Sequence, residues 1–182
     1  MRLSSILAAL AAVAFMGSSL TAADAPVMDK DGKPYPAPAE LAKQAGDAAK
    51  GQAIFTSNGA CFTCHQINGA GMVFGPNLSE VGSRKTKELI IESILYPSKV
   101  IEPGFEMIEI TLENEEKGMG IVAAETDTDL ILNMMGTKTT YKKSDIISRE
   151  KKPTSIMPPM GAALSASDVA NIAEYLAAQK KK

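Results

Sequence analysis

Apolar residues recur at the i, i+3, i+4 spacing of an amphipathic helix in three stretches of the chain. The first stretch covers about residues 47–56, although Gly51 weakens it because glycine is a poor helix former. The second covers about residues 87–95, where Thr86 can cap the helix and Pro97 ends it. The pattern therefore predicts two helices, separated by a glycine-rich stretch that has no regular period.

The third helical stretch covers about residues 166–179, near the end of the chain. The segment Ser165-Ala166-Ser167-Asp168 has the spacing of a capping box, in which side chain and backbone satisfy each other at the start of a helix. We expect one face of this helix to be buried. That face carries Val169, Ile172, Ala173 and Leu176.

Between the second and third helices, over about residues 105–147, the pattern changes to that of strands. Short runs with partial alternation are separated by turn-like sequences at regular spacing. The runs are residues 107–112, 118–123, 129–134 and 138–142. We expect an antiparallel meander or a small sheet that is inserted into an otherwise helical domain.

The first residues have the character of a secretory signal peptide. Arg2 supplies a short positive region, residues 6–16 are apolar, and Thr21-Ala22-Ala23 ends in small residues suited to signal peptidase. The apolar segment is too short to be read as a spanning helix, and no later segment is apolar enough for stable membrane insertion. We therefore expect the protein to be periplasmic or otherwise exported.

These features divide the chain into three parts. Residues 1–23 are the expected signal peptide. Residues 24–39 contain proline, aspartate and lysine with little periodicity, and we expect an extended leader that lies on the surface or is disordered. Residues 40–182 form one domain, which includes the β-rich insertion at about 105–147.

The segment Cys61-Phe62-Thr63-Cys64-His65 has the form C-x-x-C-H, the attachment signature of a c-type haem. Cys61 and Cys64 are the only cysteines of the chain, and His65 is its only histidine. In such a motif the two thiols add to the porphyrin vinyl groups, and the imidazole takes one axial position of the iron. The motif therefore predicts one covalently attached haem c, with His65 as an iron ligand.

The alternatives are a structural disulfide, a thioredoxin-like redox pair and half of a zinc site. Zinc needs three or four protein ligands, and the chain has no second Cys/His pair to supply them. A redox pair should lie at a strand–helix junction, and a disulfide leaves the adjacent His65 unexplained. Haem attachment is the preferred interpretation.

The second axial position cannot belong to another histidine or to a cysteine, because none is left. Methionine, lysine, tyrosine, the N-terminal amine or no protein ligand remain. Met157 and Met160 lie in a proline-stiffened loop before the last helix, and we favour Met157, with Met160 as second choice. Both could instead only pack. The methionines in or beside the strand-like runs are interpreted as core or sheet residues: Met107, Met119, Met134 and Met135.

The charge pattern limits the partners. The chain has a formal net charge of −2, and its lysine clusters are short, so nucleic acid is not an expected partner. Arg84 and Lys85 follow the glycine-rich stretch and could pair with a haem propionate, since arginine binds carboxylates in a bidentate manner.

The order of these features resembles a class I cytochrome c. The resemblance rests on the first helix, C-x-x-C-H, the Gly75-Pro76-Asn77-Leu78 element, and Ile156-Met157-Pro158 before a last helix that contains Glu174-Tyr175-Leu176. It covers about residues 47–95 and 153–179. It implies a mainly α fold, the class I cytochrome c fold, with an inserted small antiparallel β segment.

Within that class, three runs resemble the haem-binding domain common in planctomycete and verrucomicrobial secreted proteins. They are Gly75–Leu78, Glu92–Ser98 and Ile101–Glu106. This resemblance implies that Met157 is the second iron ligand. It also implies that the carbonyl of Pro76 accepts a hydrogen bond from Nδ1–H of His65 and so orients the ring.

The function expected from these features is that of a periplasmic electron carrier rather than an enzyme. His/Met ligation favours a six-coordinate iron with a raised potential, which transfers electrons. The expected partners are redox proteins, a periplasmic dehydrogenase on one side and an oxidase or reductase on the other. The alternative is a haem-based catalyst or a small-ligand-binding protein whose sixth position is open or labile.

Overall fold

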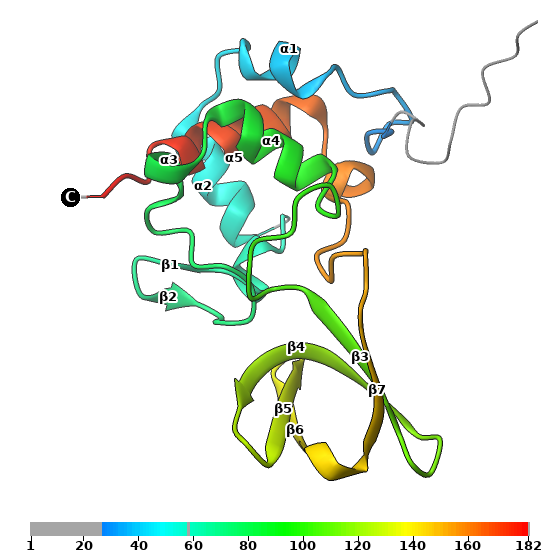
Figure 1. The fold of residues 1–182 in the computed structure, drawn as a ribbon. Coiled ribbons are helices and arrows are strands. Elements are labelled where there is room, and N and C mark those ends of the chain that lie inside the picture. The colour runs from blue at the N-terminus through cyan, green and yellow to red at the C-terminus, as the bar shows by residue number, and fades with distance from the viewer. Residues whose placement is uncertain (1–26, 58, 182) are drawn as a thin grey trace, which may run out of the picture.

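The computed structural model describes residues 27–57 and 59–181, so the predicted signal peptide lies outside the described residues. Figure 1 shows a helical part and a sheet beneath it, linked by two connections. The helical part consists of α1 (Pro38–Ala42), α2 (Ala48–Thr56), α3 (Val81–Arg84), α4 (Lys87–Leu95) and α5 (Ala166–Ala177). A short hairpin of β1 (Gln66–Ile67) and β2 (Ala70–Gly71) lies between the two parts in Figure 1.

The three predicted helices are present as α2, α4 and α5. Thr86 accepts a hydrogen bond from the backbone N–H of Leu89 at the start of α4. Ser165 and Asp168 form the predicted capping box of α5. The helices α1 and α3 were not predicted, because elements of one turn are too short to show a period.

Close contacts with α5 explain why glycine occurs at two positions in and just before α2. Gly51 is buried, and a Cβ at this position would clash with the carbonyl group of Asn171 in α5. The same Cβ would lie 2.9 Å from Cβ of Tyr175. A side chain at Gly46 would likewise meet the backbone of Ala170. The glycines that weaken the helical pattern therefore allow α2 and α5 to cross at close range.

The sheet consists of five antiparallel strands in the order β6-β5-β4-β3-β7. Its strands are β3 (Met107–Leu112), β4 (Lys117–Glu125), β5 (Asp129–Met134), β6 (Thr137–Lys142) and β7 (Ile146–Lys151). The sheet has a small core of its own, formed by Ile108, Ile110, Leu130 and Leu132. The four predicted runs correspond to β3, β4, β5 and β6.

The strand β7 was missed, so the insertion is longer than the expected 105–147. Residues Ile147 to Lys151 are exposed, and an edge strand with so few buried positions gives no hydrophobic period. β7 pairs with β3, with Ile108 opposite Lys151, so the insertion begins and ends at neighbouring strands. Helices and strands occupy comparable shares of the chain, and the expectation of a mainly α fold is not confirmed.

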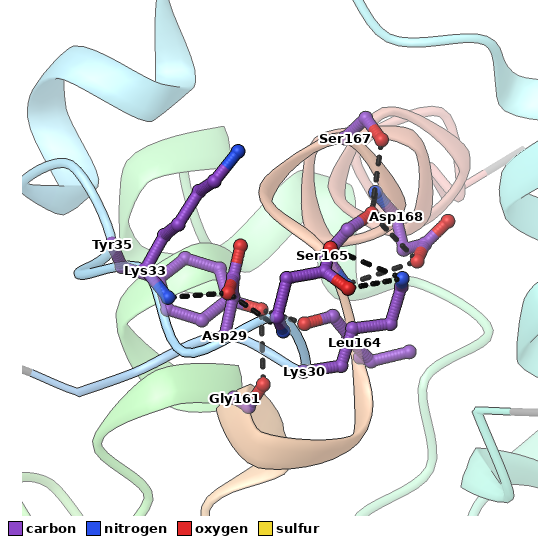
Figure 2. A network of polar contacts seen from close by, with 10 residues as sticks. Asp29, Lys30, Lys33, Tyr35, Gly161, Leu164, Ser165, Ser167 and Asp168 are labelled. Carbon is purple, nitrogen blue, oxygen red and sulfur yellow. Dashed lines mark hydrogen bonds and ion pairs between the residues drawn. The ribbon is translucent and has the colours of Figure 1, made fainter.

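The described part of the leader differs from the expected extended surface segment. The carboxylate of Asp29 accepts hydrogen bonds from the N–H groups of Asp31 and Lys33, which turns the chain back on itself. Tyr35 is buried, and its hydroxyl donates to the carbonyl of Leu164 at 2.6 Å. Figure 2 shows this turn against the segment that precedes α5. The leader is ordered here because one aromatic side chain joins the helical core.

None of the helices in the described part of the chain is long and apolar enough to span a bilayer.

Replacing Gly51 by alanine should lower the free energy of unfolding. The gain in helix propensity is about 1 kcal/mol, whereas overpacking a close contact costs about 1–3 kcal/mol and here involves rigid backbone. Denaturant unfolding of the purified holoprotein measures the difference, with the exposed Gln52→Ala in the same helix as the control. A Gly51→Ala protein more stable than wild type would contradict the close crossing.

Tyr35→Phe should lower the free energy of unfolding by about 1–2 kcal/mol at neutral pH, because two carbonyl groups lose their hydroxyl donor. Burial raises the pKa of Tyr35 from 10.0 to about 12. The stability that the buried neutral phenol contributes is therefore complete below pH 10 and is lost as the pH rises to about 12.

Denaturant unfolding between neutral pH and pH 12 tests this account of Tyr35, with Tyr141→Phe as the control. The difference in free energy of unfolding between wild type and Tyr35→Phe should become smaller as the pH rises from 10 to about 12. An advantage that is independent of pH would show that the phenol is not held in its neutral form by burial.

Candidate functional site

A cavity of about 340 Å³ is lined by both the helical part and the sheet. This volume falls in the range of small-molecule and cofactor sites. Most of the lining residues are apolar, including Ile90, Ile94 and Leu176 from the helices. All four side chains predicted to hold a haem and its iron line this cavity: Cys61, Cys64, His65 and Met157.

The C-x-x-C-H motif folds into a single tight turn. Ala60 has the left-handed φ of 50° and starts the 3₁₀ turn Cys61–Thr63. The backbone N–H groups of Cys64 and His65 both donate to the carbonyl of Cys61, at 3.2 and 2.9 Å. This compact turn brings two thiols and one imidazole to the same cavity wall.

Cys61 and Cys64 are both half-buried, and their sulfurs are not joined in a disulfide. Burial, with a smaller contribution from the neighbouring Cys64, raises the pKa of the Cys61 thiol to about 11. At neutral pH Cys61 is therefore a protonated thiol rather than a reactive thiolate.

His65 is oriented by the hydrogen bond that the resemblance implied. Its Nδ1 lies 2.8 Å from the carbonyl oxygen of Pro76. Because a carbonyl can only accept, the proton is on Nδ1, and Nε2 keeps its lone pair for a metal. Burial lowers the pKa of His65 and outweighs the hydrogen bond to Pro76, which raises it. The imidazole is thus neutral, as an iron ligand must be.

The glycine-rich stretch packs against the imidazole. A Cβ on Gly75 would lie 2.7 Å from Cε1 and 2.9 Å from Nδ1 of His65. A Cβ on Gly71, which has φ of +94°, would clash with the carbonyl oxygen of His65. Gly71 and Gly75 therefore let the backbone approach the histidine of the motif closely.

Local contacts fasten the methionine loop that follows β7. The backbone N–H of Ser155 donates to the hydroxyl of Ser98 at 3.0 Å, which ties this loop to the segment after α4. The hydroxyl of Ser155 in turn accepts from the N–H of Met157 at 3.1 Å. Met157 and Met160 are both half-buried, and both line the cavity.

The sheet also contributes to the cavity wall, through Ile121 of β4 and Met135 of the turn between β5 and β6. Met135 has φ of 51° and is 64% exposed. The interpretation of Met135 as a core or sheet residue is therefore wrong: this side chain lies at the rim of the cavity. No sequence period marks such a residue, because its position depends on the curvature of the sheet.

Arg84 lines the cavity as well, together with Lys85 and Glu102. Nη1 of Arg84 donates to Oε1 of Glu102 at 3.0 Å, and Nζ of Lys85 lies 3.5 Å from Oε2. Sequence reasoning identified Arg84 and Lys85 but missed Glu102. Glu102 lies in the run Ile101–Glu106 that carries the family resemblance, but that resemblance gave its carboxylate no partner.

Metal binding by a cluster of protein side chains alone lacks support. Among residues 27–57 and 59–181, no three His, Cys, Asp or Glu side chains gather in a group that could hold a metal ion. The donors at the cavity suit a haem, in which the porphyrin supplies most of the iron ligands.

Comparison with models of known protein families gives a match to part of the chain. Residues 48–120, from α2 through the motif and α4 into β4, match the family model of cytochrome c. No similar sequence is found among curated proteins. The match and the geometry of the motif together support a c-type cytochrome, a protein with covalently bound haem c that carries electrons.

Proposed function

We propose that this protein is a periplasmic cytochrome with one haem c, that it carries single electrons, and that His65 and Met157 are its axial iron ligands. The observation that carries the proposal is the shared cavity. The C-x-x-C-H turn and the Met157 loop are separated by the whole inserted sheet, yet both line one apolar space.

Each residue of the motif has a separate role in this proposal. Cys61 and Cys64 would hold the porphyrin by thioether bonds, and Nε2 of His65 would bind the iron. The bound haem supplies an iron that changes its charge by one electron. Pro76 and Gly75 hold the imidazole ring in place, so the ligand does not reorient when the charge changes.

Met157 is a better candidate than Met160 for the other axial face. Met160 begins the 3₁₀ turn Met160–Ala163 and packs against the helical core, which already accounts for its burial. Met157 lines the cavity without belonging to either core cluster. Its loop is fastened at Ser155, which leaves the thioether as an ordered group with no packing role.

The apolar wall favours electron transfer over catalysis. A haem shielded from water and bound by His and Met has a raised potential, because the less charged reduced state is favoured. With His65 and Met157 both bound to the iron, a substrate or gas would have no open position there. The alternative of a catalyst or gas-binding protein requires the Met157 bond to be absent or labile.

The proposed location and partners follow from the chemistry of the cofactor. A signal peptide over residues 1–23 would export the chain to the compartment where c-type haem is attached. There the protein would accept electrons from a periplasmic dehydrogenase and pass them to an oxidase or reductase. The resemblance to planctomycete and verrucomicrobial secreted haem-binding domains is part of the same proposal.

Met157→Ala should remove the weak sulfur-to-iron absorption band of the oxidised holoprotein and lower its midpoint potential, because the thioether that favours reduced iron is gone. Met160→Ala is the matched control, since it removes the same side chain from the same loop and cavity. Optical redox titration measures both quantities. Loss of the band in Met160→Ala alone would transfer the ligand role to Met160. A high-spin wild-type spectrum would favour the open-site alternative.

Intact mass spectrometry of the denatured holoprotein should give a chain that begins near Asp24 and carries the mass of one haem. Thioether bonds survive unfolding, whereas a haem held only by axial ligands is lost. The variant Cys61→Ala/Cys64→Ala, made in the same host, is the control and should lack the added mass. A wild-type chain without haem, or one that keeps residues 1–23, would contradict the corresponding part of the proposal.

A further inference from the structure

The charged groups on the cavity wall are confined to one cluster. Among the described residues that line the cavity, Arg84, Lys85 and Glu102 are the only ones with a permanently charged side chain. Glu102 bridges the two cations, with one carboxylate oxygen toward each. We call these three residues the charge cluster.

The charge cluster has one positive charge in excess and unused hydrogen-bonding capacity. Nη2 of Arg84 donates to the carbonyl of Asn77 at 2.8 Å, and Nζ of Lys85 donates to the hydroxyl of Ser93 at 3.3 Å. A guanidinium group has five N–H donors and an ammonium group has three, so both cations can accept a further anion. The cluster therefore suits a second carboxylate beside Glu102.

We propose that Arg84 and Lys85 bind one haem propionate and that Glu102 is the positioning residue that holds both cations at the cavity wall. This inference rests on the proposed function, because it requires a haem in the cavity. A carboxylate that is withdrawn from water needs a charged partner, and the described wall offers such partners only here. The cluster thus also determines which edge of the haem faces α3 and α4.

Glu102 is needed because Arg84 and Lys85 carry like charges at adjacent positions. Without a bridging carboxylate their heads would repel each other and turn to water. The side chains of Lys85 and Glu102 are only 25% and 28% exposed, so this pair is partly shielded from solvent, unlike an ordinary surface ion pair. Arg84, at 46%, is the more exposed member, and Glu102 and the carbonyl of Asn77 together orient its guanidinium group.

The test uses holoprotein whose haem propionates carry carbon-13 in their carboxylate groups, introduced through labelled δ-aminolevulinic acid. Infrared difference spectra between the oxidised and reduced states then identify the propionate bands by their isotope shift. Arg84→Gln and Lys85→Gln should each shift the labelled band of one propionate. Glu102→Gln should shift the same band, because the cations that it holds move away.

Glu106→Gln is the matched control, since Glu106 lies near Glu102 in sequence and pairs with Lys151 on the sheet instead of lining the cavity. It should leave the labelled bands unchanged. In an Arg84→Gln/Lys85→Gln background, Glu102→Gln should cause no further shift. Labelled bands that are the same in wild type and both single cation variants would overturn the propionate site. A further shift in the double background would overturn the positioning role.

The sulfur-to-iron absorption band separates this result from a failure of the proposed function. If the band is present in wild type and in all these variants, the proposed ligation by His65 and Met157 is supported. The infrared data then test the charge cluster alone. If the band is absent from wild type, the proposed ligation fails, whereas unshifted propionate bands in its presence reject only the cluster.

Discussion

The antiparallel pairing of β3 with β7 determines where the candidate axial methionine lies. These strands begin and end the inserted sheet, so the chain leaves the helical part and returns to it at one place. The pairing continues beyond the strands, where the N–H of Lys152 donates to the carbonyl of Met107 and Ser155 is bound by Ser98. The loop that carries Met157 is thereby delivered to the cavity that the C-x-x-C-H turn lines.

The two sides of the site are built by different kinds of contact. Around His65 every contact is local: the turn at Cys61, the carbonyl of Pro76 and the close backbone of Gly75 lie within a short stretch of chain. The Met157 side depends on long-range strand pairing. The histidine side is therefore formed whenever this stretch folds, whereas the methionine side requires the complete sheet. Displacement of the Met157 loop is the expected first consequence of destabilising the insertion.

Features that depend on local contacts could be predicted from the sequence, whereas features that depend on long-range contacts could not. The sequence was sufficient for the motif, for helices α2, α4 and α5, and for the caps of α4 and α5, because local patterns encode them. The hydrogen bond from His65 to Pro76 was implied by the family resemblance. The sequence was insufficient for β7, a polar edge strand, and for the burial of Tyr35. It was also insufficient for the rim position of Met135 and for the pairing of Glu102 with Arg84. These features arise from contacts between distant segments, which a single sequence does not reveal.

The most direct test of the central claim is the iron K-edge X-ray absorption fine structure of the oxidised holoprotein. It reports the elements bound to iron without reference to the potential or the optical spectrum. The account predicts one sulfur neighbour in wild type and in Met160→Ala, and none in Met157→Ala. An iron with no sulfur neighbour in wild type, or a sulfur that persists in Met157→Ala, would contradict the account.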